Sequence, residues 1–273
     1  MAEHILVTLG KERFGSVIRQ TIHFVDDIKQ NDFLNDIENT PHAFVLACLM
    51  DRQIKAERAW SIPSQIQRII GSFEIDDLIK VSAGEYKSIF TQYSLHRFND
   101  TMADVFCAGV HGISERFDGD ASQIWSNNPS SAKVVYEFLL FNGSGPKIAT
   151  MAANILARDF KIPFSDYYSI DISPDVHIMR VMQRTGLVSP EADKNAVIYK
   201  ARELNPEFPG IVDFSCWEIG REWCRPKSPN CQACIIRSEC KKLYRGQKQY
   251  KLEGEAYEKI TVHRPEKYRS TGL

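Results

Sequence analysis

The chain has 273 residues, of which 43% are hydrophobic and 25% are charged, and its formal net charge is −1. This length and apolar content suffice for one large domain or two modest ones with a buried core. No apolar run approaches the roughly 20 residues of a membrane-spanning helix, which excludes a membrane-spanning protein. The first residues lack the basic region and long apolar stretch of a secretion signal, so we expect an intracellular protein.

The first 35 residues are expected to form a small N-terminal appendage. Residues 5–9 (Ile-Leu-Val-Thr-Leu) and 16–18 (Ser-Val-Ile) resemble extended segments, which predicts a strand or a hairpin. The stretch 26–38 is acidic. This part of the sequence offers no motif with a recognisable chemistry.

Most of the following chain has the pattern of helices. Apolar residues from Ala43 to Trp60 follow helical spacing, and Pro63 is expected to end or restart that helix. Ser130 or Ser131 is suited to cap a helix at 132–141, and Ser173 a helix that starts near 175. The predicted helices after Pro63 cover 64–70, 75–79, 102–117, 132–141, 147–160, 175–184, 195–203 and 210–223.

A turn with two glycines separates the predicted helices 132–141 and 147–160. Gly143 and Gly145 are expected to supply positive φ angles and a close backbone approach. Pro146 suits the first helical position, where its missing N–H costs little. Free N–H groups at such a helix N-terminus point outward and suit a phosphate, although the same pattern also occurs in ordinary helix–helix turns.

Four cysteines near the C-terminus are spaced C-x6-C-x2-C-x5-C; they are Cys224, Cys231, Cys234 and Cys240. Four thiols within seventeen residues suit one metal centre with tetrahedral sulfur ligation. A disulfide framework is disfavoured, because no secretion signal is evident and only Cys48, Cys107 and Cys216 remain in the chain. The spacing alone leaves open whether the metal centre is an iron–sulfur cluster or zinc.

The cysteine run lies in a basic stretch of the chain. Between Arg221 and Lys251 the sequence contains nine basic residues and two acidic ones. A basic patch beside an acidic body can contact phosphates even when the total charge is close to zero. We therefore expect DNA contact from this stretch, including Arg225, Lys227 and Arg237, against the alternative of a solvated surface.

In this order, the glycine turn, the segment 174–181 and the cysteine run resemble the endonuclease III family of helix-hairpin-helix DNA glycosylases. The resemblance covers roughly residues 35–245, with weaker similarity at 117–120 and 213–224. The cysteine spacing equals that of the family's iron–sulfur loop. The family patterns LPGVGxKTA and VDTHIxRV are matched at Gly143, Gly145, Lys147 and Ala149, and at Asp175, His177, Ile178, Arg180 and Val181.

The resemblance implies an all-α fold with two helical lobes that grip DNA across a cleft. One lobe is expected to comprise 63–175, with the helix-hairpin-helix at 132–160. The other is expected to combine 36–62 and 176–245, with the iron–sulfur loop at 224–240, and a C-terminal tail is expected at 246–273. The four cysteines of that loop would hold a 4Fe–4S cluster that braces the basic loop and has no direct role in bond breaking.

The resemblance also implies base-excision repair by a glycosylase with abasic-site lyase activity. Lys147 would attack C1′ of a flipped-out damaged nucleotide, and the strand would break by β-elimination. Asp175 would stabilise the positive charge at C1′ and move protons. Gly143 and Gly145 would bind backbone phosphate, and Arg52 or Gln53 would fill the space that the base leaves. A phosphate-binding lysine, a helix-capping aspartate and a solvent-facing 51–53 turn remain the alternative interpretations.

Some residues depart from the family pattern and point to a divergent branch with a different lesion. Phe141-Asn142 replaces leucine-proline at the hairpin, and the stretch 166–171 looks inserted. Two other functions stay open: a monofunctional mispair or deaminated-base glycosylase, and a non-catalytic iron–sulfur DNA-binding protein. The expected partner is double-stranded DNA with a damaged base or an abasic site. We expect a monomer without membrane association, in the prokaryotic cytoplasm with the nucleoid, or in a eukaryotic nucleus.

Overall fold

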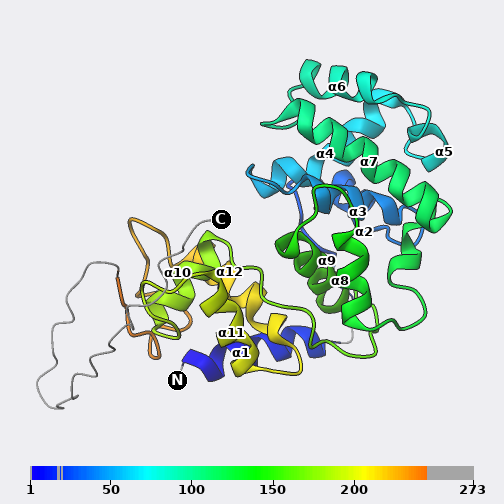
Figure 1. Ribbon diagram of the computed structural model, residues 1–273. Coiled ribbons are helices and arrows are strands. Elements are labelled where there is room, and N and C mark those ends of the chain that lie inside the picture. Colours follow the sequence, from blue (N-terminus) through cyan, green and yellow to red (C-terminus); the bar gives the residue numbers. More distant parts are fainter. Residues whose placement is uncertain (1, 17–18, 20, 245–273) are drawn as a thin grey trace, which may run out of the picture.

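The computed structural model describes residues 2–16, 19 and 21–244, and this part of the chain is all-helical, as predicted. Figure 1 shows two helical bodies joined by extended connections. None of the described helices is both long and apolar enough to cross a bilayer. The helices are α1 (Ala2–Gly15), α2 (Ile28–Asn35), α3 (Pro41–Met50), α4 (Ala56–Ile70), α5 (Ile75–Leu78), α6 (Ala83–Gln92), α7 (Asn99–Phe117), α8 (Ser131–Leu139), α9 (Pro146–Arg158), α10 (Val176–Thr185), α11 (Lys194–Leu204) and α12 (Asp213–Glu222), with short 3-10 helices η1 (Ala121–Ile124) and η2 (Pro209–Val212).

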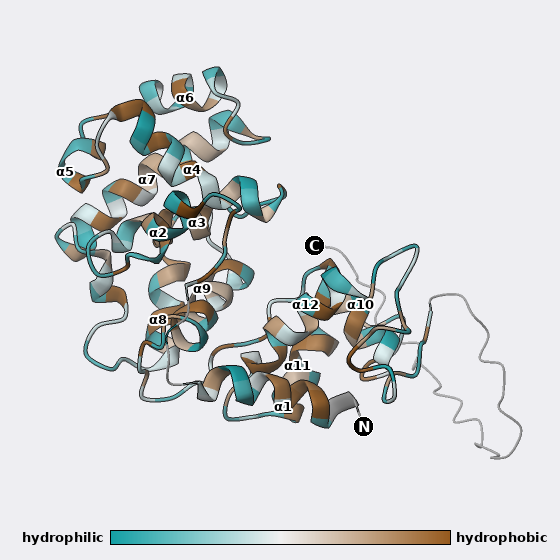
Figure 2. Ribbon diagram, turned by 180° about the vertical axis from the view of Figure 1, so that it is seen from behind, coloured by the Kyte–Doolittle hydropathy of each residue, from teal (hydrophilic) through white to brown (hydrophobic). Residues whose placement is uncertain are grey.

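The larger body, which we call the hairpin lobe, contains α2 to α9 and is organised around α3. All ten residues of α3 are buried, and this helix packs against α2, α4, α7, α9 and η1. Figure 2 shows α3 as a mainly hydrophobic helix in the middle of this body. A helix that is apolar on every side needs cover on every side, and the surrounding helices supply it.

The predicted helix from Ala43 to Trp60 is two helices, α3 and α4, with a break at 51–55. Pro63 does not end α4 but lies inside it, and it is buried. The hydroxyl groups of Ser61 and Ser64 donate to the Arg58 and Ser61 carbonyls, which adds side-chain hydrogen bonds to the backbone around the proline. Packing of α4 on α3 keeps the helix intact across the proline.

The second body, which we call the terminal lobe, contains α1, α10, α11, α12, η2 and the cysteine loop 224–240. The prediction of an extended segment at 5–9 is wrong, because these residues belong to α1, which packs against α12 and η2. Leu6 is fully buried, and a Cβ on Gly10 would lie 2.1 Å from the Ile211 carbonyl oxygen. This burial outweighs the strand preference of the β-branched residues. Residues 17 and 18 of the other extended segment lie outside the described residues.

The division of the chain between the lobes also differs from the expected one. The described part of residues 1–35 forms no separate appendage, since α1 packs in the terminal lobe and α2 packs against α3 and α4. Residues 36–62 were expected in the terminal lobe, but α3 and the start of α4 form the core of the hairpin lobe. The expected tail 246–273 lies outside the described residues, as do three basic residues of the basic stretch, Arg245, Lys248 and Lys251.

Polar contacts join the two lobes along α9. Asp159, at the end of α9, accepts hydrogen bonds from Arg13 of α1 and from the neighbouring Arg158. Asn154 of α9 donates its amide N–H to the Gly210 carbonyl of η2 at 2.9 Å. The Asn154 contact is buried, and it holds η2, which leads directly into α12, against α9.

A candidate active-site cleft between the lobes

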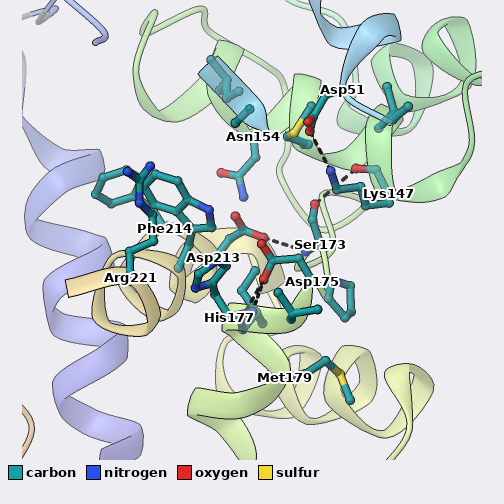
Figure 3. A pocket seen from close by; sticks show the side chains of 18 of the residues that line it. Asp51, Lys147, Asn154, Ser173, Asp175, His177, Met179, Asp213, Phe214 and Arg221 are labelled. Atoms are coloured by element: carbon teal, nitrogen blue, oxygen red, sulfur yellow. Dashed lines mark hydrogen bonds and ion pairs between the residues drawn. The ribbon is translucent and has the colours of Figure 1, made fainter. Parts of the chain in front are cut away.

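A large cleft lies between the two lobes, and Figure 3 shows the residues that line it. The hairpin lobe contributes the loop that follows α3, the glycine turn and one side of α9. The terminal lobe contributes the segment 173–180 and the first half of α12. Helix ends and turns therefore surround the cleft, and they present backbone N–H groups and polar side chains to it.

The glycine turn connects α8 and α9 as a helical hairpin. Ser130 caps α8 by accepting a hydrogen bond from the Lys133 N–H, as predicted. Gly143 has a φ of 79°, and Pro146 is the first residue of α9. The prediction for Gly145 is wrong, because its φ is −125° and it serves as the extended N-cap of α9. One left-handed residue is thus enough to reverse the chain between these two helices.

Lys147 lies in the first turn of α9 and points into the cleft. Its ammonium group is 2.7 Å from the Oδ2 atom of Asp51, which lies in the loop after α3. The lysine side chain is 44% exposed and that of Asp51 is 13% exposed. The pair therefore leaves the lysine accessible from the cleft while the carboxylate is mostly covered.

Asp175 is the N-cap of α10, on the opposite side of the cleft. Its Oδ1 atom accepts hydrogen bonds from the His177 and Ile178 N–H groups, both at 2.8 Å. Ser173 is not the cap; it donates its backbone N–H elsewhere. His177 packs against α12, since a Cβ on Gly220 would lie 2.6 Å from the His177 Cβ.

Another ionisable group in the cleft is Asp213, the first residue of α12. Its Oδ2 atom accepts the Ser173 N–H at 2.6 Å, and Figure 3 shows it beside Asp175. Burial, with a smaller contribution from the nearby Asp175, raises the pKa of Asp213 to about 6 against the opposing effects of Arg158, the Ser173 N–H and Lys147. Asp175 and Asp213 are thus two neighbouring carboxyl groups in different environments.

Sequence reasoning did not assign a role to Asp51 or to Asp213. Asp51 is 96 residues from Lys147 along the chain, and no local pattern indicates that the two side chains meet. Asp213 falls within the weak similarity at 213–224, but neither its type nor its spacing marks it as part of a site. Only the folded arrangement of α9, α10 and α12 brings these groups together.

The other residues predicted to contact DNA occupy two regions. Arg52, Gln53, Gly143 and Gly145 all line the cleft, and Gln53 has a φ of 55°. The basic residues Arg225, Lys227 and Arg237 are exposed on the cysteine loop, outside the cleft. The loop is held to α10 by Arg184, which donates to the Arg225 and Pro226 carbonyls at 2.8 and 2.9 Å.

The four cysteines of the loop line one small cavity together with Arg184, Ile219 and Ile236. Burial and the neighbouring thiols raise the pKa of Cys234 and of Cys240 above the ordinary thiol value. Within the described residues, no three His, Cys, Asp or Glu side chains already lie close enough together to ligate one metal ion. The thiols thus share a cavity whose donor set is all sulfur, which fits an iron–sulfur cluster or zinc.

Comparison with known proteins gives relatives in both sequence and structure. Endonuclease III from Thermotoga maritima is 31% identical over 108 residues, which are 38% of this chain and 44% of that protein. Endonuclease III-like protein 1 from Bos taurus is 30% identical over 135 residues, which are 47% of this chain and 36% of that protein. The chain thus spans less than half the length of these curated relatives, and no protein-family model matches it.

Solved structures match over most of the chain. An endonuclease III trapped in a covalent intermediate with DNA gives a TM-score of 0.58 at 16% identity, covering 89% of this chain and 96% of that one. A thermostable thymine-DNA glycosylase gives a TM-score of 0.57 at 14% identity, covering 88% and 95%. The two-lobed helix-hairpin-helix arrangement is therefore shared with these proteins. The chain is thus similar to endonuclease III over part of its sequence, and its fold is similar to that of endonuclease III.

Proposed function

We propose that this protein is a base-excision repair enzyme, a DNA glycosylase with abasic-site lyase activity. The observation that carries the proposal is that Lys147 of the hairpin lobe and Asp175 of the terminal lobe line one cleft. A nucleophilic amine and a carboxylate on opposite walls suit attack on a sugar carbon that lies between them. The similarity to endonuclease III and to glycosylase structures supports the same reaction class.

The substrate would be double-stranded DNA with a damaged base or an abasic site. The N–H groups at the glycine turn and the start of α9 suit a backbone phosphate, because a helix N-terminus carries a partial positive charge. The glycosidic carbon is out of reach inside a stacked duplex, so the nucleotide would turn out into the cleft. Arg52 and Gln53 line the cleft from the hairpin lobe, and they are suited to occupy the space that the base leaves in the DNA duplex.

The lysine must lose its proton before it can attack. In the free protein its ammonium group is held 2.7 Å from the Asp51 carboxylate, in a pair that contributes up to about 1 kcal/mol at a partly exposed site. DNA that separates Asp51 from Lys147, or a proton transfer to Asp51, would therefore free the amine for attack on C1′.

Asp175 would stabilise the positive charge that develops at C1′. Its Oδ1 atom is held by two backbone N–H groups, so the carboxylate is fixed in orientation before the substrate arrives. A fixed anion stabilises an oxocarbenium-like state without reorganisation at the moment of reaction. The same carboxylate can then move protons while the sugar ring opens.

The cysteine loop would hold a 4Fe–4S cluster through Cys224, Cys231, Cys234 and Cys240. An all-thiolate donor set around one cavity supports this assignment over a carboxylate or imidazole metal site. The bound group would supply structural order, because a metal centre fixes the chain that ligates it. Arg180 and Arg184 bond to the Cys224 and Arg225 carbonyls and would carry that order to α10 and the cleft.

Borohydride trapping on a duplex with a single abasic site tests the lysine assignment. We expect a covalent protein–DNA adduct with the wild type, because an imine between the amine and C1′ is reducible. Lys147→Ala should abolish the adduct, whereas Lys133→Ala, a change at an exposed lysine on α8, should leave it intact. An adduct that persists in Lys147→Ala would contradict the assignment.

A monofunctional glycosylase is the second candidate, and the Asp51–Lys147 ion pair favours it. If the pair persists on DNA, the lysine stays bound to the Asp51 carboxylate and water must attack C1′ instead. That enzyme would release the base without forming an adduct. Base release with no trapped adduct and no strand cleavage would establish this alternative.

A further inference from the structure

The two carboxyl groups on the terminal side of the cleft differ in how they are held. Asp175 accepts two backbone N–H groups on one oxygen, in the first turn of α10. Asp213 accepts one N–H, from Ser173, and lies deeper, between α9 and α10. A carboxylate with several N–H donors stays ionised, whereas a desolvated one beside another negative charge takes up a proton more readily. Paired carboxyl groups in unequal environments separate into an acid and a base.

The groups that face Asp213 come from three directions. Lys147 and Arg158 face it from α9, and Asp175 faces it from the start of α10. Its own helix contributes the buried thiol of Cys216. Burial raises the pKa of Asp213 to about 6 despite the two cations, so a proton can leave or arrive near neutral pH.

The wall of the cleft next to Asp213 contains polar atoms without partners. Asn154 is 1% exposed and Arg158 is 5% exposed, and both line the cleft from α9. The Asn154 Oδ1 and Arg158 Nη1 atoms are buried and lack hydrogen-bond partners. Unpaired buried polar atoms are costly, so their presence behind this wall distinguishes it from an ordinary packed core.

We propose that Asp213 is a second catalytic carboxyl group, the acid that protonates the departing base, while Asp175 stabilises the positive charge at C1′. This inference rests on the proposed function. As the Lys147 nitrogen bonds to C1′, the C1′–N glycosidic bond breaks and its electron pair moves to the base. The Asp213 proton moves to the base, which leaves as a neutral molecule, and Asp213 becomes a carboxylate that takes a new proton from water.

The test compares two reactions of the same protein. An abasic site has no base to protonate, so borohydride trapping on it requires Lys147 but not Asp213. Excision from duplexes with 5-hydroxyuracil, uracil opposite guanine, or 8-oxoguanine requires both. We expect Asp213→Asn to slow single-turnover excision about 100-fold, the size of a general-acid contribution, with trapping within about twofold of wild type.

Two further variants sharpen the test. Asp213→Glu should restore part of the excision rate, because it keeps a proton donor. Asp171→Asn, which removes a carboxylate paired with Arg202 outside the cleft, should leave both reactions unchanged. Wild-type excision should slow as the pH rises above about 6, and Asp213→Asn should lose that dependence.

Excision by Asp213→Asn within about threefold of wild type, or loss of trapping together with excision, would overturn the acid role. A wild type that traps the abasic site but releases none of the three bases would also overturn it, while the lyase reaction would stand. Absence of both reactions in the wild type would overturn the proposed function as well.

Discussion

Asp213 is a residue whose position in the cleft opposes the stability of the fold. Its pKa is 3.8 in an ordinary environment and about 6 in the folded chain, chiefly because burial disfavours the charged form. The folded state therefore binds this proton more tightly than the unfolded state does. The contribution of the protonated Asp213 to the stability of the fold is fully present below pH 3.8 and is lost as the pH rises through about 6. The two pKa values correspond to a loss of at most about 3 kcal/mol.

Asp213→Asn is accordingly expected to stabilise the protein at high pH. The amide can still accept the Ser173 N–H, but it carries no charge to bury. The free energy of unfolding at pH 8 should rise by about 1 to 3 kcal/mol, with little change at pH 4. Urea denaturation at the two pH values measures the difference. Equal or lower stability of the variant at pH 8 would contradict the burial of a charge at this position.

Single residues also show the limit of prediction from the sequence. Lys147 and Asp175 were predicted because each belongs to a short local pattern next to a helix start. Asp51 and Asp213 were not, because their roles depend on neighbours from distant parts of the chain. A lone aspartate gives no local signal until the packing of the helices around it is known.

At the scale of elements, the hairpin turn depends unequally on its two glycines. Gly143 has a positive φ, and a Cβ there would lie 2.9 Å from the Val105 side chain and 3.1 Å from Arg52 Nη1. Gly145 has ordinary backbone angles, and a Cβ there would meet no atom within 4 Å. We expect Gly143→Ala to lower the free energy of unfolding by about 1 to 3 kcal/mol and Gly145→Ala by less than about 1.

Thermal or urea unfolding of the two glycine variants, in parallel, checks this expectation. Equal effects of the two substitutions would mean that the turn does not require the left-handed residue. The comparison is well matched, because both changes add one methyl group within the same turn.

The elements that the sequence predicted well are those with both a periodic pattern and a local signal. Helix α8 has its serine cap, and α9 has its glycine turn and Pro146. The predictions failed where packing overrides local preference, as in α1, whose strand-like residues pack on α12, and at Pro63, which α4 tolerates. The break between α3 and α4 carries no proline or glycine, so nothing local marks it.

At the scale of the molecule, the cysteine loop connects to the cleft through two arginines. Arg180 bonds to the Cys224 and Gly220 carbonyls, and Arg184 bonds to the Arg225 and Pro226 carbonyls. Both arginines belong to α10, which begins at Asp175. Order in the loop is therefore coupled to the wall of the cleft that carries this carboxylate.

Cys234→Ser tests that coupling. We expect the variant to lose the visible absorbance of an iron–sulfur cluster, to become more sensitive to proteolysis between Cys224 and Cys240, and to bind duplex DNA at least tenfold more weakly. Cys107→Ser, at a buried cysteine of α7 far from the loop in sequence, is the control. A Cys234→Ser protein with unchanged absorbance would rule out this residue as a cluster ligand.

The ion pair between Asp51 and Lys147 has a consequence for the reaction of the free protein with aldehydes other than an abasic site. Primary amines condense with sugars and other aldehydes, and an amine suited to an abasic site is exposed to the same reaction. A lysine nitrogen held 2.7 Å from a carboxylate must leave that partner before it can bond to a carbonyl carbon. If Lys147 is the nucleophile, as proposed, the contact would also hold its nitrogen away from other aldehydes until DNA separates the pair.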